Sequence, residues 1–154
     1  MDLRAHWRGR ERYTVFATTY GDGADARALQ ADWLADPDRP ARLHIVALTA
    51  ELQPGFHRIP QDDPRLTLTL LAMPLDAALA QLSAQPDAVF LDALVGTGFV
   101  RPLARIVARD ARLSAVSLDE GQRAALAGQG FVFGSDHDAV FASRKPRLPV
   151  PPVP

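Results

Sequence analysis

Short apolar runs alternate with helical patterns along most of the chain, and this alternation constrains the fold more than any other feature. Five of the runs are rich in β-branched and aromatic residues, and turn residues bound them. Because these runs are apolar throughout, they predict buried parallel strands with helices on both faces of one sheet. The five strands are predicted at 13–19, 43–48, 66–71, 87–92 and 113–118.

Helices are predicted between the strands, and a strand hairpin is predicted at the end. Apolar residues at helical spacing and capping residues place the helices at 26–34, 75–82, 99–108 and 119–126. Two last short strands, 131–133 and 139–142, follow each other around a polar turn and predict an antiparallel edge. Residues 51–57 are interrupted by Pro54 and are assigned to no element. The prediction is one α/β domain over residues 1–145 with a mostly parallel seven-stranded sheet, and an exposed Pro-rich tail over 146–154.

The composition excludes several classes of protein. The chain has 154 residues, the size of one domain, and no cysteine, which excludes disulfides, thiolate metal sites and a cysteine nucleophile. The four histidines lack metal-binding spacing, so no metal site is predicted. The start is too charged for a signal peptide and no apolar run approaches the ~20 residues of a membrane span, so a cytoplasmic protein without a membrane partner is expected.

Charge also limits the partners that this chain can have. The net charge of −1 argues against a dedicated nucleic-acid binder, because phosphate contacts usually require a basic surface. One basic cluster stands at the N-terminus, and it is expected to be a solvated, partly mobile end: Arg4, Arg8, Arg10 and Arg12.

The first strand ends in a turn with two glycines, Gly21 and Gly23. Ligands of open α/β sheets bind outside the carboxyl ends of the strands, and glycine lets a ligand approach the backbone at the start of a helix. Residues 21–26 also fit the dinucleotide pattern G-x-G-x-x-G/A. Asp22 and Asp25 would repel an anionic pyrophosphate, so a generic nucleotide site is the weakest of the functional hypotheses.

The ends of the other strands carry further candidate residues. The second strand ends at Thr49, where a nucleoside cofactor needs a carboxylate for its ribose hydroxyls, and Glu51 is the nearest replacement. Met73 and Pro74 after the third strand offer adenine no side-chain hydrogen bond. The fourth strand ends at Asp92, the best candidate for catalysis; a simple cap of the next helix is the alternative of equal weight.

Several segments of the chain carry a family pattern. Residues 7–13 read W-R-G-R-E-R-Y, residues 16–25 read F-A-T-T-Y-G-D-G-A-D, and Trp33 follows in a helix; further matches are 35–44, 68–71, 87–92 and 103–106. These segments resemble the methyltransferase domain of the bacterial bifunctional tRNA 5-methylaminomethyl-2-thiouridine biosynthesis proteins, the MnmC family. That family has W-x-G-R-x-R-[FY] followed by L-E-T-G-F-G-x-G-x-N and a helix with a tryptophan.

The resemblance implies a Rossmann-like fold of S-adenosylmethionine (SAM) dependent methyltransferases, in which seven strands with the last two joined directly are usual. It implies SAM as the cofactor and tRNA as the partner, with methylation of an aminomethyl group on the wobble uridine. An FAD-dependent domain prepares that amine in the family; residues 1–154 contain no such segment, so no FAD is expected. The resemblance assigns Thr19, Gly21, Gly23 and Thr49 to the cofactor and Asp92 to the substrate side.

The departures from the family pattern gather where ligands would bind. Ala17 stands for the acid of the first motif, Thr19 for its first glycine, Thr49 for the ribose-binding acid and Pro74 for an aspartate on the adenine side. The family's D-G-F-A-P-A-K-N-P-x-M-W keeps only its first residue, Asp92. We therefore predict a degenerate domain, a pseudoenzyme with weak or no activity. An active divergent methyltransferase and a non-catalytic interaction module, as a homo-oligomer or with a partner protein, stay open.

Overall fold

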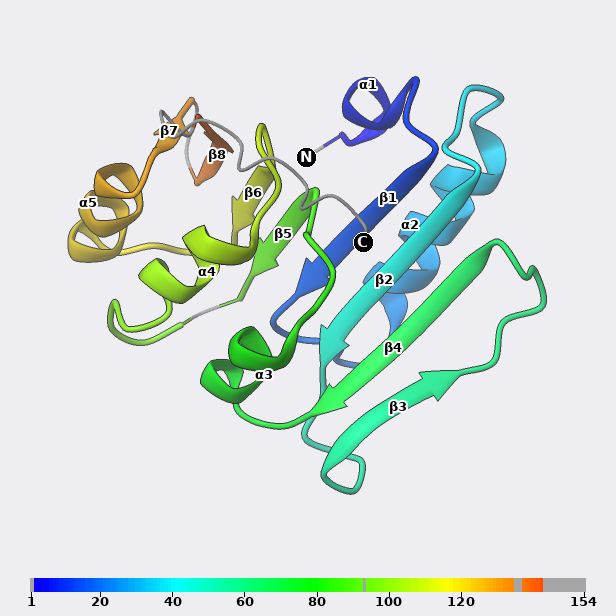
Figure 1. The fold of residues 1–154 in the computed structure, drawn as a ribbon, viewed down its shortest axis with the longest axis horizontal. Coiled ribbons are helices and arrows are strands. Elements are labelled where there is room, and N and C mark those ends of the chain that lie inside the picture. Colours follow the sequence, from blue (N-terminus) through cyan, green and yellow to red (C-terminus); the bar gives the residue numbers. More distant parts are fainter. Residues whose placement is uncertain (1, 93, 135–136, 143–154) are drawn as a thin grey trace, which may run out of the picture.

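The computed structural model describes residues 2–92, 94–134 and 137–142, and these form one eight-stranded sheet. The strand order is β3-β4-β2-β1-β5-β6-β8-β7 (Figure 1). The pairs β3–β4, β6–β8 and β7–β8 are antiparallel, and the others are parallel. The strands are β1 (Arg12–Ala17), β2 (Arg42–Leu48), β3 (Gly55–Ile59), β4 (Leu66–Ala72), β5 (Ala88–Leu91), β6 (Arg112–Ala115), β7 (Phe131–Phe133) and β8 (Asp138–Phe141).

The seven predicted strands and the four predicted helices are present, so the α/β class and the antiparallel edge are confirmed. The tail at 146–154 lies outside the described residues. Asp119 caps the last helix as expected. Its carboxylate accepts from the Gln122 N–H at 2.7 Å, and the Asp119 N–H donates to Gln122 Oε1 at 3.1 Å. The helices are α1 (Arg4–Trp7), α2 (Ala24–Ala35), α3 (Leu75–Gln81), α4 (Val100–Ile106) and α5 (Glu120–Gly128).

Strand β3 is an eighth strand that the sequence analysis did not assign. It lies between Pro54 and Pro60 and pairs with β4 alone, at the edge of the sheet. Proline is tolerated at such an edge because it removes no hydrogen bond that a central strand would need. The two prolines bound the strand and do not interrupt it, which is why the predicted count of seven strands is one too low.

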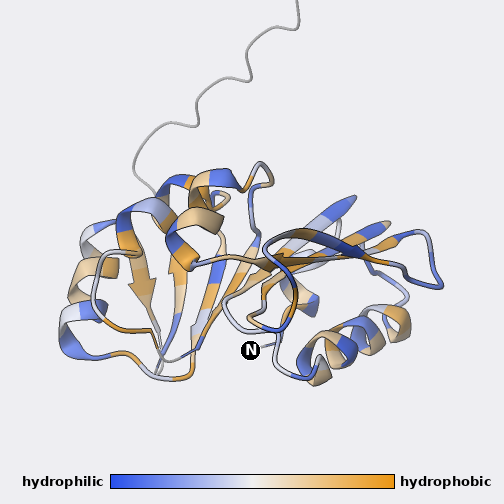
Figure 2. Ribbon diagram, turned by 90° about the horizontal axis from the view of Figure 1, so that it is seen from below, coloured by the Kyte–Doolittle hydropathy of each residue, from blue (hydrophilic) through white to orange (hydrophobic). Residues whose placement is uncertain are grey.

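Two apolar cores lie on opposite faces of the sheet, beneath helices on both sides (Figures 1 and 2). Phe16 packs in the core beneath α3, α4 and α5, whereas its neighbour Val15 packs in the core beneath α1 and α2. This division follows from the strand pleat, which points successive side chains to opposite faces. Trp7 and Trp33 are fully buried in the second core, where each contributes about 1.5–3 kcal/mol or more by leaving water.

Helices cover both faces of the sheet as expected, but the second face is covered only in part. Leu113 on β6 and Ala139 on β8 are buried in the first core, but Ser114 and Val140 on the other side are only half-buried. The Ser114 hydroxyl donates to the Asp138 carboxylate at 2.7 Å. Strand β6 alternates between polar and apolar residues and β8 alternates in burial, the pattern of a strand with one face toward water.

The N-terminal segment is packed against the domain, so the expectation of a solvated, partly mobile end holds only for the side chains of three of its four arginines. Trp7 is fully buried, and its indole N–H donates to the Asp36 carboxylate at 2.7 Å. This bond is the main cause that lowers the pKa of Asp36. Arg10 donates to Asp110 at 2.8 Å and to Asp87 at 3.4 Å. The other three arginines of the cluster are exposed to water, namely Arg4, Arg8 and Arg12.

His6 joins this N-terminal segment to β1. Arg10 donates from Nη2 to His6 Nε2 at 3.1 Å, and since arginine can only donate, Nε2 accepts. The ring proton is therefore assigned to Nδ1, which donates to the Tyr13 hydroxyl at 2.5 Å. Burial, and then the charge of Arg10, lower the pKa of His6, and burial raises the pKa of Tyr13. The network favours the neutral form of both rings.

Candidate binding cavity at the strand ends

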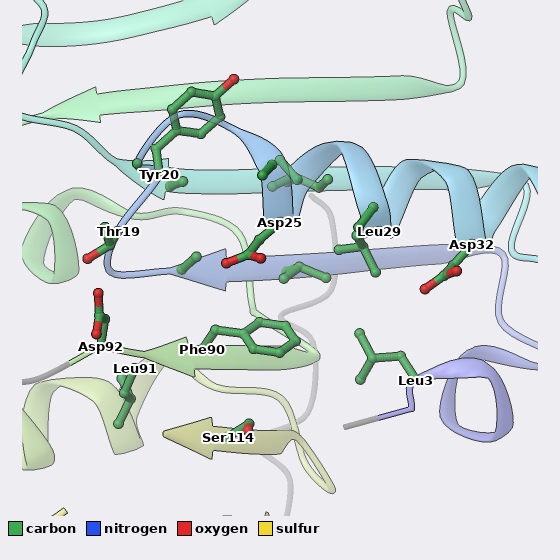
Figure 3. A pocket seen from close by; sticks show the side chains of 18 of the residues that line it. Leu3, Thr19, Tyr20, Asp25, Leu29, Asp32, Phe90, Leu91, Asp92 and Ser114 are labelled. Atoms are coloured by element: carbon green, nitrogen blue, oxygen red, sulfur yellow. The ribbon is translucent and has the colours of Figure 1, made fainter. Parts of the chain in front are cut away.

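A cavity of about 540 Å³ lies between α2 and the sheet and opens at the carboxyl ends of β1 and β5 (Figure 3). Its floor consists mainly of small or apolar residues of the neighbouring parallel strands β1, β2 and β5, with Ser114 and Ala115 of β6 beside them, and α2 forms one wall. Leu3, which precedes α1, lies at the far end. The volume is within the ~300–1,000 Å³ range of small-molecule sites.

Three of the five predicted site residues line this cavity. Thr19 and Gly21 follow β1, and Asp92 follows the adjacent strand β5, so parallel strand ends bring them to the same edge. Gly23 and Thr49 do not line the cavity. Gly23 is the N-cap of α2, and Thr49 follows β2 with its hydroxyl accepting from the Glu51 N–H at 3.3 Å.

The two glycines of the first turn differ in what surrounds them. Both have left-handed backbones, with φ of 61° at Gly21 and 84° at Gly23. A Cβ at Gly21 would meet nothing within 4 Å, whereas one at Gly23 would lie 2.5 Å from the Tyr20 hydroxyl and 2.9 Å from Arg27 Nη1. The space over Gly23 is therefore filled by the protein's own side chains, and only Gly21 presents open backbone to the cavity.

Asp92 is held by its backbone and not by its carboxylate. Its N–H donates to the Thr18 hydroxyl at 2.9 Å. Within residues 2–92, 94–134 and 137–142, its carboxylate forms no hydrogen bond or ion pair. Helix α4 begins at Val100 with Phe99 as its N-cap, so Asp92 is not the cap of that helix. The carboxylate is available to a ligand at the mouth of the cavity.

A single buried side chain holds the loop that follows β5. Gln122 on α5 is 2% exposed, and its Nε2 donates to the Leu94 carbonyl at 2.6 Å and to the Gly96 carbonyl at 3.0 Å. Its Oε1 accepts from Asp119 as part of the capping box. The N-terminus of α5 thus fixes the path of the chain beyond Asp92.

From the sequence, Asp25 is expected beside a ligand of the glycine turn, whereas no site role is expected for Leu29, Asp32 or Phe90. Asp25, Leu29 and Asp32 lie along the side of α2 that faces the cavity, and Phe90 contributes to the floor (Figure 3). Their spacing of four and three residues indicates one side of a helix, but this spacing alone does not separate a solvated side from the wall of a cavity. The burial of Trp33 decides the orientation of α2.

No model of a known protein family matches this chain. It is 34% identical to the MnmC protein of Azoarcus sp. (strain BH72) over 84% of this chain and 26% of the relative, and 28% identical to that of Burkholderia cenocepacia (strain HI2424) over 94% and 28%. The chain spans about a quarter of the length of these curated relatives. The crystal structure of MNMC2 from Aquifex aeolicus superposes with a TM-score of 0.69 at 19% identity, covering 92% of this chain and 56% of the other.

The sheet topology and the open strand ends define the fold class of the chain. An eight-stranded sheet that is parallel in the middle, closed by an antiparallel hairpin and open to ligands at its strand ends, is a Rossmann-like fold of the SAM-dependent methyltransferase type. Within that class the chain is MnmC-like: it resembles the tRNA 5-methylaminomethyl-2-thiouridine biosynthesis bifunctional proteins over 84–94% of its length.

The strand ends do not fit SAM well. Thr49 offers a ribose only a weak acceptor, and the Glu51 side chain is exposed to solvent. Pro74 is the N-cap of α3 and has no hydrogen-bonding side chain for an adenine. Tyr20 fills the space over Gly23. Among the described residues, no group of three histidines, aspartates or glutamates could hold a metal, and no helix is long and apolar enough to cross a membrane.

Proposed function

We propose that this chain is a methyltransferase-like domain, related to wobble-uridine modification of tRNA, that binds SAM weakly and transfers no methyl group. The family relationship supports the first part. The observation that carries the second part is the glycine turn, where Tyr20 and Arg27 occupy the space over Gly23 that a close ligand would need. The proposed place of action is the cytoplasm, with tRNA as the ancestral partner.

The expected loss of SAM affinity follows from the acidic residues that this chain lacks. The family resemblance places acids where this chain has Ala17, Thr49 and Pro74. Each charge-assisted hydrogen bond contributes about 1.5–3 kcal/mol, so the loss of two weakens SAM binding by roughly 10²–10⁴-fold. Titration calorimetry with SAM should give a dissociation constant weaker than ~100 μM. A low-micromolar constant would show that other residues hold the cofactor and would refute the proposal.

A second candidate, an active but divergent methyltransferase, is favoured by one observation. The Asp92 carboxylate has no partner within the described residues and lies at the mouth of the cavity. An amine must lose its proton before it can attack a methyl group, and a nearby carboxylate can accept that proton. Asp92 would then be the residue on which turnover depends.

An assay with labelled SAM and tRNA bearing the aminomethyl nucleoside distinguishes the two candidates. The proposal predicts incorporation at background for the wild type and for Asp92→Ala alike. Incorporation above background in the wild type that disappears in Asp92→Ala would establish the divergent enzyme instead. The exposed Asp76→Ala on α3 is the matched control, since Asp76 lies outside the cavity.

A further inference from the structure

The cavity extends well beyond the strand ends where Asp92 lies. It continues along the sheet face between α2 and β5 until it reaches Leu3 and Asp32 (Figure 3). The floor of this inner part is apolar and consists of residues from three strands, namely Val15, Ala17, Ile45, Ala47 and Phe90. The Phe90 side chain lies along the sheet in Figure 3 and is half-buried, so part of its ring is available to a flat ligand.

The α2 wall above this floor combines one apolar and two acidic side chains. Leu29 lies between Asp25 and Asp32, and all three are on the cavity side of the helix (Figure 3). These positions border the buried side of α2 that carries Trp33. Helix positions that face a sheet are usually apolar, so two carboxylates here leave an open, charged wall where close packing would otherwise be expected.

The charge of the lining is strongly one-sided. Five aspartates and one arginine line the cavity, which gives it a net charge of −4. Arg4 lies 3.6 Å from Asp32, but the Asp32 side chain is still 59% exposed and can bind a second cation. A cavity with low-dielectric walls focuses such a field, so anions such as nucleotide phosphates are repelled and cations are attracted.

From this combination of shape, floor and charge we infer that the inner part of the cavity binds an organic cation with a flat apolar body. The body would pack on Phe90 and Leu29, and the cationic group would bind either Asp25 or Asp32, which stand two turns apart on α2 at the two ends of this wall. The volume of about 540 Å³ accommodates a ligand of the size of a substituted indole or larger. This inference concerns binding alone and does not depend on whether the domain binds SAM or transfers methyl groups.

Three indole probes that differ mainly in charge test the inference: tryptamine (a cation), tryptophol (neutral) and indole-3-propionate (an anion). Amide chemical shifts of the labelled full chain are followed at low ionic strength. We expect tryptamine to bind about two- to fivefold more tightly than tryptophol, with indole-3-propionate weakest, because one partly exposed carboxylate in contact contributes about 0.5–1 kcal/mol. The shifts should cluster at Ala17, Leu29 and Phe90.

Variants connect the charge preference to this site. Asp25→Asn with Asp32→Asn should reduce tryptamine binding to the level of tryptophol and leave tryptophol unchanged. The control Asp76→Asn removes an exposed acidic residue from the first turn of α3, as Asp25→Asn does from α2. It should leave the affinity for tryptamine and for tryptophol unchanged. Phe90→Ser should weaken both probes by about fivefold, since it removes the apolar floor.

The inference is overturned if tryptamine does not bind, if tryptamine and tryptophol bind equally, or if the shifts lie elsewhere. It is also overturned if the control Asp76→Asn weakens tryptamine as much as the double variant does. A parallel titration with SAM bears only on the proposed function. Tight SAM binding would refute that proposal, while the three-probe comparison would still decide the present inference.

Discussion

Gln122 offers the sharpest test of how α5 holds the loop beyond Asp92. We consider Gln122→Met, which nearly preserves the volume and removes every polar atom of the side chain. The wild-type side chain forms three hydrogen bonds, two to the carbonyls of Leu94 and Gly96 and one from the Asp119 N–H. Each contributes a net ~0.5–1.5 kcal/mol. Gly96 is exposed, so water can replace part of the loss there, and we expect a total of about 2–3 kcal/mol.

Urea unfolding followed by circular dichroism measures this loss. The denaturation midpoint should fall without a change in the slope of the free energy against urea concentration, because the variant exposes nearly the same surface on unfolding as the wild type. Amide hydrogen exchange should also accelerate in the loop at 94–98, since the tie to α5 is gone. The control Gln81→Met changes an exposed glutamine on α3 and should stay within about 0.5 kcal/mol of the wild type. A loss below ~0.5 kcal/mol for Gln122→Met, or unchanged exchange in the loop, would refute the assignment.

Two further predictions concern stability. Burial and the charge of Arg10 lower the pKa of folded His6 from 6.5, so the unfolded chain binds the proton more readily and the free energy of unfolding should fall as pH drops below about 6.5. His6→Gln should flatten that dependence in chemical denaturation between pH 5 and 7.5, and an unchanged slope would count against it. Gly23→Ala and Gly21→Ala should each cost about 1–2 kcal/mol because φ is positive at both positions, and Gly23→Ala should cost more because the ends of the Tyr20 and Arg27 side chains must move. Equal losses in thermal unfolding would contradict the packing described over Gly23.

The central sheet could be predicted because its strands are short runs rich in apolar, β-branched and aromatic residues that turn residues bound, and helical patterns separate them. Strand β3 could not, because its five residues, G-F-H-R-I, form neither an apolar run nor a polar–apolar alternation and prolines flank them, so nothing local separates the strand from a loop. The docked N-terminal segment was missed for another reason. Leu3 and Trp7 are too few to suggest a core, and the polar partners of this segment follow much later in the sequence.

The residues of the candidate site also fall into those that the sequence predicts and those that it does not. The meeting of Thr19, Gly21 and Asp92 follows from a general rule about parallel strand ends, and the structure places them around one cavity. Asp25 is expected near the glycine turn, but Asp32 could not be recognised as a cavity residue, because its exposure to the cavity depends on how α2 is rotated about its axis. That rotation is set by long-range packing of Trp33, which a local pattern does not encode.

The attachment of the N-terminal segment has a consequence for synthesis on the ribosome. Arg10 bonds to Asp87 and Asp110, which are 77 and 100 residues further along the chain. At roughly 5–20 residues per second, Asp110 is made about 5–20 s after Arg10. Until then Trp7 and Tyr13 lack part of the surface that covers them, and the nascent chain exposes aromatic side chains that the finished domain buries. During this interval the nascent chain exposes the most aromatic surface to which a ribosome-associated chaperone could bind.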